Sequence, residues 1–173
     1  MTMSVTTLLT EEEFLNLPES PGKQELLDGE LIELPPARYS HSELIKRLVK
    51  LLHTVLDESR VWTETAYRLR PRRWLIPDAS VSWPGQPIED DWFQRAPMLA
   101  IEVASRGNSP EQLEQKVAAY LEHGVGEVWI VYPATRSMVV FRQDSTLRVA
   151  GQSDYRCDLI GVTVTPGHRT PLP

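Results

Sequence analysis

Residues 98–121 read MLAIEVASRGNSPEQLEQKVAAYL and predict a buried strand followed by a helix. Met98 to Ala104 is apolar except for Glu102, and it has the length of a strand that is covered on both faces. Ser109-Pro110-Glu111-Gln112 then starts a helix, with a capping serine, a proline in the first turn and a glutamine three residues after the cap. Gly124 is expected to end this helix. Such a strand and helix pair is typical of sheet proteins with helices packed on their faces.

The N-terminal segments predict a hairpin between two helices. Thr10-Glu11-Glu12-Glu13 is a capping box, which predicts a short first helix. Asp28-Gly29 is a two-residue turn signal inside a hairpin from Lys23 to Leu34. Ser40 and Glu43 form another capping-box pattern, and apolar residues at helical spacing follow them.

Further strands follow along the chain, and a surface loop is expected over residues 84–97. The predicted strands are 61–70, 75–83, 98–104, 128–131 and 138–141, with weaker ones at 147–150 and 159–164. This order predicts an α/β (α+β) domain with a central mixed sheet, flanking helices and an N-terminal hairpin. Residues 1–173 contain no repeat or long linker, so a single domain is predicted.

The composition is that of an ordinary globular protein, with 41% hydrophobic and 24% charged residues. Cys157 is the single cysteine, so no internal disulfide can form. No apolar run is long enough to span a bilayer, and Met1 to Leu9 has no basic residue ahead of its apolar stretch. We therefore expect a cytoplasmic protein with no membrane partner.

The charge distribution argues against indiscriminate coating of nucleic acid, because the net charge is −6. The segment from Arg60 to Arg73 nevertheless has a local charge of +4. Arg68 and Arg70 alternate around Leu69 within it and are candidate contacts to a nucleic acid. The alternative is that they form the solvated face of a strand.

Two carboxylates lie in apolar surroundings. Asp78 lies within LIPDASV at residues 75–81, and Glu102 is the only charged residue of its predicted strand. An ionised carboxylate removed from water persists only if it is paired, neutralised or bound to a metal. Each acid therefore either forms a structural ion pair, lies on a wet face of its strand, or belongs to a functional site.

Lys116 is the third unusual charge. It lies three residues after Leu113 and four before Tyr120, within the apolar stripe of the helix that follows the Glu102 strand. The ammonium either extends to water from the edge of this stripe or meets the two buried carboxylates. In the second case the three residues could hold a hard divalent cation such as Mg²⁺ or Mn²⁺ and act on a phosphate ester.

The arrangement Pro77-Asp78, Ile101-Glu102-Val103 and a downstream lysine resembles the PD-(D/E)xK nuclease superfamily. It resembles more closely the Uma-two family of restriction-endonuclease-like proteins. The similar segments are QELLDGEL at 24–31, Pro35-Pro36 with His41, KVAAY at 116–120 and GVGEVWIVYP at 124–133. The resemblance is strongest over residues 11–141.

The resemblance implies a restriction-endonuclease-like core that uses Mg²⁺ or Mn²⁺. Asp78 and Glu102 would hold the metal, with help from the Val103 carbonyl. The resemblance also implies that Lys116 supplies the amine, and that Glu25 completes the metal shell or remains a paired acid at the edge of a strand.

Two local features bear on nucleic-acid contact. His41 lies near a predicted helix start and either contacts a phosphate or caps the helix. Ser105-Arg106-Gly107-Asn108 departs from the Ser-Pro-Ser that is common in the family, and Arg106 is a further candidate phosphate contact. The tail after Gln143 matches the family poorly and is either a divergent edge or an oligomer contact.

These observations predict a metal-dependent endonuclease that hydrolyses phosphodiester bonds of DNA. The alternative is a nuclease core without turnover, which binds nucleic acid or acts as a regulatory module that dimerises. DNA is the expected partner, and a homodimer is an open alternative to a monomer.

Overall fold

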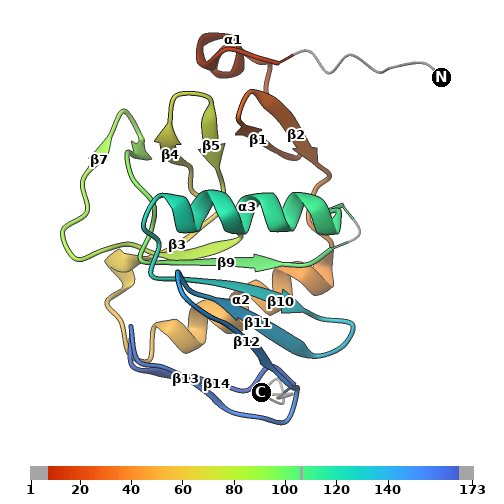
Figure 1. Cartoon of the computed structure of the whole chain (residues 1–173), viewed down its shortest axis with the longest axis vertical. Helices are drawn as coiled ribbons and strands as arrows, with labels where there is room; N and C mark the ends of the chain where they lie inside the picture. The colour runs from red at the N-terminus through yellow and green to blue at the C-terminus, as the bar shows by residue number, and fades with distance from the viewer. Residues whose placement is uncertain (1–7, 106, 168–173) are drawn as a thin grey trace.

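Strand β9 (Leu99–Val103) lies in the interior of a six-stranded sheet (Figure 1). The computed structural model describes residues 8–105 and 107–167. The strand order is β12-β11-β10-β9-β6-β3. The other members are β3 (Val61–Thr63), β6 (Ala79–Val81), β10 (Glu127–Tyr132), β11 (Ser137–Phe141) and β12 (Thr146–Val149). β10 is parallel to β9 and the other neighbours are antiparallel, so the sheet is mixed, as predicted.

The alternation of side chains along β9 decides which residues face each helix. Leu99, Ile101 and Val103 belong to the core that includes α2 (Tyr39–Leu52). Ala100 belongs to the core on the other face, which includes α3 (Pro110–Glu122). Glu102 shares the face of Ala100, so its carboxylate is directed toward α3.

A second six-stranded sheet has the order β2-β1-β5-β4-β8-β7. Its strands are β1 (Lys23–Leu27), β2 (Glu30–Leu34), β4 (Tyr67–Arg70), β5 (Arg73–Leu75), β7 (Ile88–Glu89) and β8 (Trp92–Phe93). Asp28 and Gly29 connect β1 to β2 with φ values of 56° and 95°, the left-handed conformation that a two-residue hairpin turn favours. The predicted hairpin is therefore confirmed.

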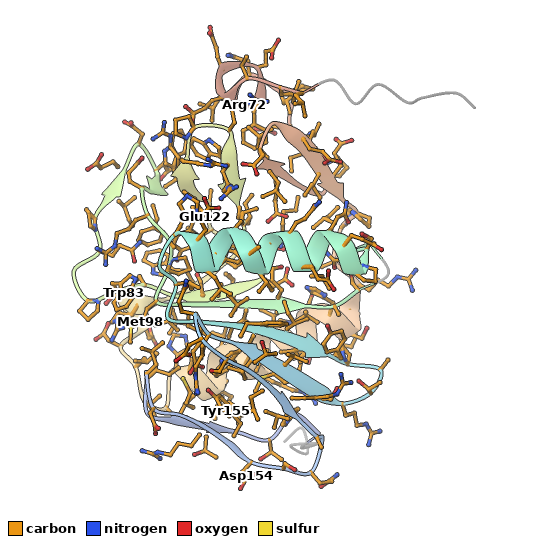
Figure 2. The ribbon with its side chains drawn as sticks, in the orientation of Figure 1. Arg72, Trp83, Met98, Glu122, Asp154 and Tyr155 are labelled. Carbon is orange, nitrogen blue, oxygen red and sulfur yellow. The ribbon has the colours of Figure 1, made fainter. Side chains whose placement is uncertain are left out.

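Arg73 connects this hairpin to α3. Its guanidinium donates to Asp28 Oδ1 at 2.9 Å and Oδ2 at 2.7 Å, and it also pairs with Glu122 at the end of α3. Figure 2 labels Glu122 at this end of the helix. The ion pairs hold β1 beside α3, which brings the strand of Glu25 close to the helix of Lys116.

Two of the predicted strands are each divided between the two sheets. Residues 61–70 form β3 and β4, and Glu64 between them has a φ of 48°, which interrupts the extended chain. Residues 75–83 contain the end of β5 and all of β6, separated by Ile76-Pro77-Asp78. Asp78 therefore precedes a strand instead of lying within one. The strands of the predicted single sheet are accordingly divided between two six-stranded sheets, and β13 and β14 pair in a third, two-stranded sheet, while the mixed α/β class is confirmed.

The remaining elements differ from expectation in detail. Helix α1 (Glu11–Leu15) has the predicted capping box, but α2 begins at Tyr39, with Arg38 as its N-cap and no side-chain cap. Ser40 and Glu43 already lie inside α2, so their capping box was wrong. The other elements are η1 (Glu58–Arg60), β13 (Tyr155–Cys157) and β14 (Val162–Val164), and the predicted 84–97 loop contains β7 and β8. Within the described ranges no helix is long and apolar enough to cross a membrane.

Candidate metal and active site

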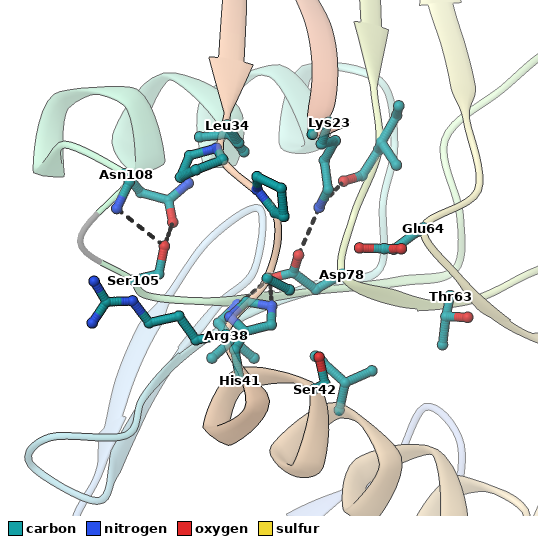
Figure 3. Close-up of a pocket in the computed structure, with 18 of the residues that line it drawn as sticks. Lys23, Leu34, Arg38, His41, Ser42, Thr63, Glu64, Asp78, Ser105 and Asn108 are labelled. Carbon is teal, nitrogen blue, oxygen red and sulfur yellow. Dashed lines mark hydrogen bonds and ion pairs between the residues drawn. The ribbon is translucent and has the colours of Figure 1, made fainter. Parts of the chain in front are cut away.

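Asp78 lies between β5 and β6, and groups from three other elements contact its carboxylate (Figure 3). Lys23 Nζ on β1 is 2.6 Å from Asp78 Oδ1. The backbone N–H of Val103 on β9 donates to Oδ2 at 2.8 Å. His41 Nε2 on α2 lies 3.4 Å from Oδ2. Both carboxylate oxygens are thus held in place by the surrounding fold.

These contacts favour the ionised form of Asp78. Burial alone would raise the pKa of the carboxyl group, but hydrogen bonding from His41, the Lys23 ammonium and the Val103 N–H outweigh that effect. The pKa of Asp78 is therefore held well below its usual range. Asp78 is a stable anion at neutral pH, as a metal-binding carboxylate must be.

Glu102, Glu25 and Lys116 form a buried group behind Asp78. Lys116 Nζ is 2.6 Å from Glu102 Oε1 and 2.8 Å from Glu25 Oε1. The Tyr120 hydroxyl donates to Glu102 Oε1 at 3.2 Å, and the backbone N–H of Ile76 donates to Glu25 Oε1 at 2.7 Å. Lys116 is 1% exposed, and these distances show that its ammonium meets the buried carboxylates, which is the second of the two predicted alternatives.

The protonation of this buried group is finely balanced. Burial raises the pKa of Glu102 to about 7, opposed by the Lys116 ammonium and reinforced by the negative charges of Asp78 and Glu25. Burial would lower the pKa of Lys116, but its two carboxylate partners raise that pKa above its usual range. The surroundings therefore favour the cationic form of Lys116 and oppose ionisation of Glu102.

When all three acids of the site are ionised, their negative charge exceeds the positive charge of the two lysines by one. Asp78, Glu25 and Glu102 share the ammonium groups of Lys23 and Lys116. Glu25 Oε2 is buried and has no hydrogen-bond partner among the described residues, an arrangement that is costly unless another cation or proton reaches it.

The donor set fits a hard divalent cation. Carboxylate and carbonyl oxygens are the ligands that Mg²⁺ and Mn²⁺ prefer, and Mg²⁺ often takes only one or two carboxylates because it retains waters. In residues 8–105 and 107–167, no three His, Cys, Asp or Glu side chains are arranged as a metal cage. A metal here would therefore rely on two acids, with backbone or water completing the shell.

A pocket of about 1430 Å³ opens beside Asp78. Lys23, His41, Asp78 and Val103 are among its lining residues, whereas Glu25, Glu102 and Lys116 are not. Figure 3 shows Lys23 reaching Asp78 from one side and His41 reaching it from the other. The site thus has an accessible layer that faces the pocket and a buried layer behind it.

The structure separates the other candidate contacts. His41 lines the pocket, but Arg68 pairs with Glu11 and Arg70 pairs with Asp28, and neither arginine lines the pocket. The solvated-face alternative therefore describes these two arginines better than the nucleic-acid prediction. Arg106 lies outside the described residues.

Lys23 is the residue that the sequence reasoning missed. It lies at the first position of β1, beside polar residues, and has the pattern of an ordinary surface lysine. One signal was present: Lys23 shares the alternation of Glu25 and Leu27, so it lies on the same face of β1 as the buried acid.

The fold and the convergence of Asp78, Glu25, Glu102 and Lys116 define a mixed α/β protein with a nuclease-like core. The chain belongs to the Uma2 family, described as putative restriction endonuclease, which it matches over residues 11–161. The match extends beyond Gln143 and includes residues 144–161 of the tail.

A solved structure has the same fold. It is the crystal structure of a putative nuclease belonging to DUF820 from Anabaena variabilis ATCC 29413, with a TM-score of 0.82 and 23% sequence identity. The similarity covers 91% of this chain and 95% of that chain. No curated protein matches the chain.

Proposed function

We propose that this protein is a metal-dependent nuclease that hydrolyses phosphodiester bonds of DNA. The observation that carries the proposal is the convergence of three carboxylates and two ammonium groups beside an open pocket. Family membership and the fold of the Anabaena protein support the same reaction class. Strongly perturbed acids that border a pocket are typical of catalytic sites.

Asp78 and Glu102 would hold Mg²⁺ or Mn²⁺, with the Val103 carbonyl or water completing the shell and Glu25 paired with Lys116. When bound, such an ion supplies Lewis acidity toward a phosphate oxygen and lowers the pKa of a bound water. The residues of the chain hold these ligands in place. The Val103 N–H fixes Asp78, and the Lys116 ammonium bridges Glu25 and Glu102.

DNA is the proposed substrate because two groups that can bind an anion, Lys23 and His41, contact Asp78 at the pocket. Arg38 and Lys46 line the pocket too, as do the acids Glu19 and Glu64, so its lining carries both signs of charge. α2 begins at this pocket without a side-chain cap or an acidic residue in its first turn, and the N-terminus of a helix favours a phosphate.

A second candidate is a module that binds nucleic acid without cleaving it. The observation that favours it is that Lys23 and Lys116 already neutralise much of the acidic charge. Such a module would bind DNA with an affinity that does not depend on divalent metal, whereas the nuclease requires the metal for turnover.

Metal binding is tested by thermal unfolding of the wild type and of Asp78→Asn, with Mg²⁺ or Mn²⁺ at about 100 times the dissociation constant. We expect the metal to raise the wild-type melting temperature by roughly 5 to 10 °C and to leave Asp78→Asn unchanged. Asp158→Asn is the matched control, because its side chain is 88% exposed and lies in an exposed ion pair. Equal shifts in all three proteins would contradict the metal site.

Turnover is tested separately, with end-labelled single-stranded, duplex and branched DNA in the presence of each metal. The nuclease proposal expects cleavage by the wild type and by Asp158→Asn, and none by Asp78→Asn. DNA binding that needs no metal, without cleavage of any of these substrates, would favour the binding module.

A further inference from the structure

The two lysines of the site have different access to the pocket. Lys116 is 1% exposed, does not line the pocket and bridges two carboxylates. Lys23 is 10% exposed, lines the pocket and contacts only one carboxylate, that of Asp78. An ammonium that acts on a substrate phosphate must be reachable from the substrate side, and Lys23 meets this condition.

Lys116 cannot leave its position without a large penalty. Its departure would leave Glu25 and Glu102 buried without their shared cation, and removing one partner of a buried ion pair is strongly destabilising. The Lys116 ammonium is therefore suited to holding the two acids at fixed positions.

Among the described residues, the Lys23 ammonium uses two of its three N–H donors. Its ammonium donates to Asp78 Oδ1 at 2.6 Å and to the Ile76 carbonyl oxygen at 2.9 Å. An ammonium has three N–H groups, so one donor is left for a ligand in the pocket. A metal that binds Asp78 Oδ1 would compete with Lys23 for that oxygen and release a second donor toward the substrate.

The surroundings of Lys23 fit an anion. β1 holds its backbone by pairing Lys23 with Leu34, while the side chain retains its flexible stem. His41 contacts the same carboxylate from the opposite element, and α2 begins at the same pocket without a side-chain cap or an acidic residue in its first turn.

We propose that Lys23, and not Lys116, is the catalytic ammonium that contacts the scissile phosphate, and that Lys116 is a positioning residue for Glu25 and Glu102. This inference rests on the proposed nuclease function. It changes the role that the sequence predicts for Lys116, and it assigns a catalytic role to a residue outside the predicted set.

Single-turnover cleavage of a labelled DNA by Lys23→Gln is the first test. Lys50→Gln is the matched control, because Lys50 is an exposed lysine on α2 that does not line the pocket. We expect Lys23→Gln to lower the cleavage rate at saturating DNA by roughly 100-fold, and Lys50→Gln to change it by less than about threefold. Equal effects, or an unaltered rate in Lys23→Gln, would overturn the inference.

A second readout does not depend on turnover. The wild type is produced with lysine that carries ¹³C at Cε, which leaves all three N–H donors in place, and the Lys23 resonance is identified by its loss in Lys23→Arg. We expect this resonance to shift when a phosphorothioate oligonucleotide that resists cleavage is added. An unchanged Lys23 resonance in a protein that cleaves DNA would overturn the proposed role of Lys23 and leave the nuclease function standing.

The two proposals fail in different ways. A wild type that cleaves no DNA with either metal, while its Lys23 resonance shifts on adding the oligonucleotide, would overturn the nuclease function and leave Lys23 as a phosphate contact. A wild type with neither cleavage nor a shifted resonance would overturn both.

Discussion

Two carboxylates are buried on adjacent strands of the central sheet, and the number of donors around them differs. Glu127 on β10 accepts hydrogen bonds from Trp129 Nε1 at 2.8 Å, Arg142 Nε at 2.9 Å, Tyr155 OH at 2.8 Å and Cys157 Sγ at 3.3 Å. Each of its two oxygens has at least two partners. This cluster joins the C-terminal hairpin to the sheet, and Figure 2 labels Tyr155 within it.

Glu102 on β9 is less well satisfied. It contacts Lys116 and Tyr120, but the negative charges of Asp78 and Glu25 are also close enough to raise its pKa. Glu102 therefore lies close to two other carboxylates and has fewer hydrogen-bond donors than Glu127.

The pKa values reflect this difference. Burial opposes ionisation of Glu127, but its donors outweigh burial and lower its pKa, whereas the pKa of Glu102 is raised to about 7. A buried acid with complete hydrogen bonding stabilises the fold, while strongly perturbed acids that are crowded together are typical of functional sites. By this criterion we interpret the Glu127 cluster as structural and propose that the Asp78 and Glu102 group is functional.

The largest expected effect separates the two regions by activity. Asp78→Asn removes the charge of a proposed metal ligand and should lower the cleavage rate by roughly 1,000-fold or more. Glu127→Gln should change it by less than about threefold, because the hydrogen bonds of Glu127 lie in a separate cluster that contains none of the proposed site residues. Single-turnover assays under conditions where both variants are folded measure this ratio. Similar losses in the two variants would remove the distinction.

The next largest effect concerns stability within the functional group. Lys116→Met leaves Glu25 and Glu102 without their bridging cation and should lower the free energy of unfolding by roughly 3 to 5 kcal/mol. Urea unfolding measures the change. Lys46→Met is the control and should change stability by less than about 0.5 kcal/mol, because Lys46 is 73% exposed. A loss in Lys116→Met no larger than that of the control would show that the buried ion pairs do not hold the site together.

The Glu127 cluster should lose less stability when its charge is removed. Glu127→Gln keeps one acceptor oxygen and loses the charge-assisted bonds, so unfolding should become easier by about 1.5 to 3 kcal/mol. The exposed Glu30→Gln provides a surface control. Stability unaltered by Glu127→Gln would contradict the structural role of the cluster.

The smallest effect is expected at Cys157, a fully buried thiol in the Glu127 cluster. Burial and the neighbouring Glu127 carboxylate raise the pKa of Cys157 to about 12, so the reactive thiolate is scarce at pH 8. Labelling by a disulfide reagent should be slow in the native wild type and about three- to tenfold faster in Glu127→Gln, because the cluster then opens more readily. Rapid labelling of the native wild type would show that the cluster is already open.

The sequence predicts the acids of the site but misses one of its two lysines. Asp78, Glu102 and Lys116 were found because a charge inside an apolar segment requires a partner, and Glu25 was found from the resemblance to the family. Lys23 was missed because a lysine at the start of a strand is ordinary, and its place on the same face of β1 as Glu25 was the one signal in the sequence.

Some features of the fold were predictable from the sequence and others were not. The Asp28-Gly29 turn was predictable because its φ values suit those two residues. The break of residues 61–70 at Glu64 was not, because the left-handed conformation of a glutamate depends on which sheet each half joins. Ser40 and Glu43 fit a capping pattern, but the pattern does not show which residue keeps the extended backbone of an N-cap. In this protein that residue is Arg38.

We propose above all that Asp78 and Glu102 bind one divalent cation beside the pocket. Anomalous diffraction from a crystal soaked in Mn²⁺ tests this directly. We expect one strong peak about 2 Å from an oxygen of Asp78 and of Glu102, with the Lys23 ammonium displaced from Asp78 Oδ1. No peak at this position, with Lys23 still bound to Asp78, would contradict it.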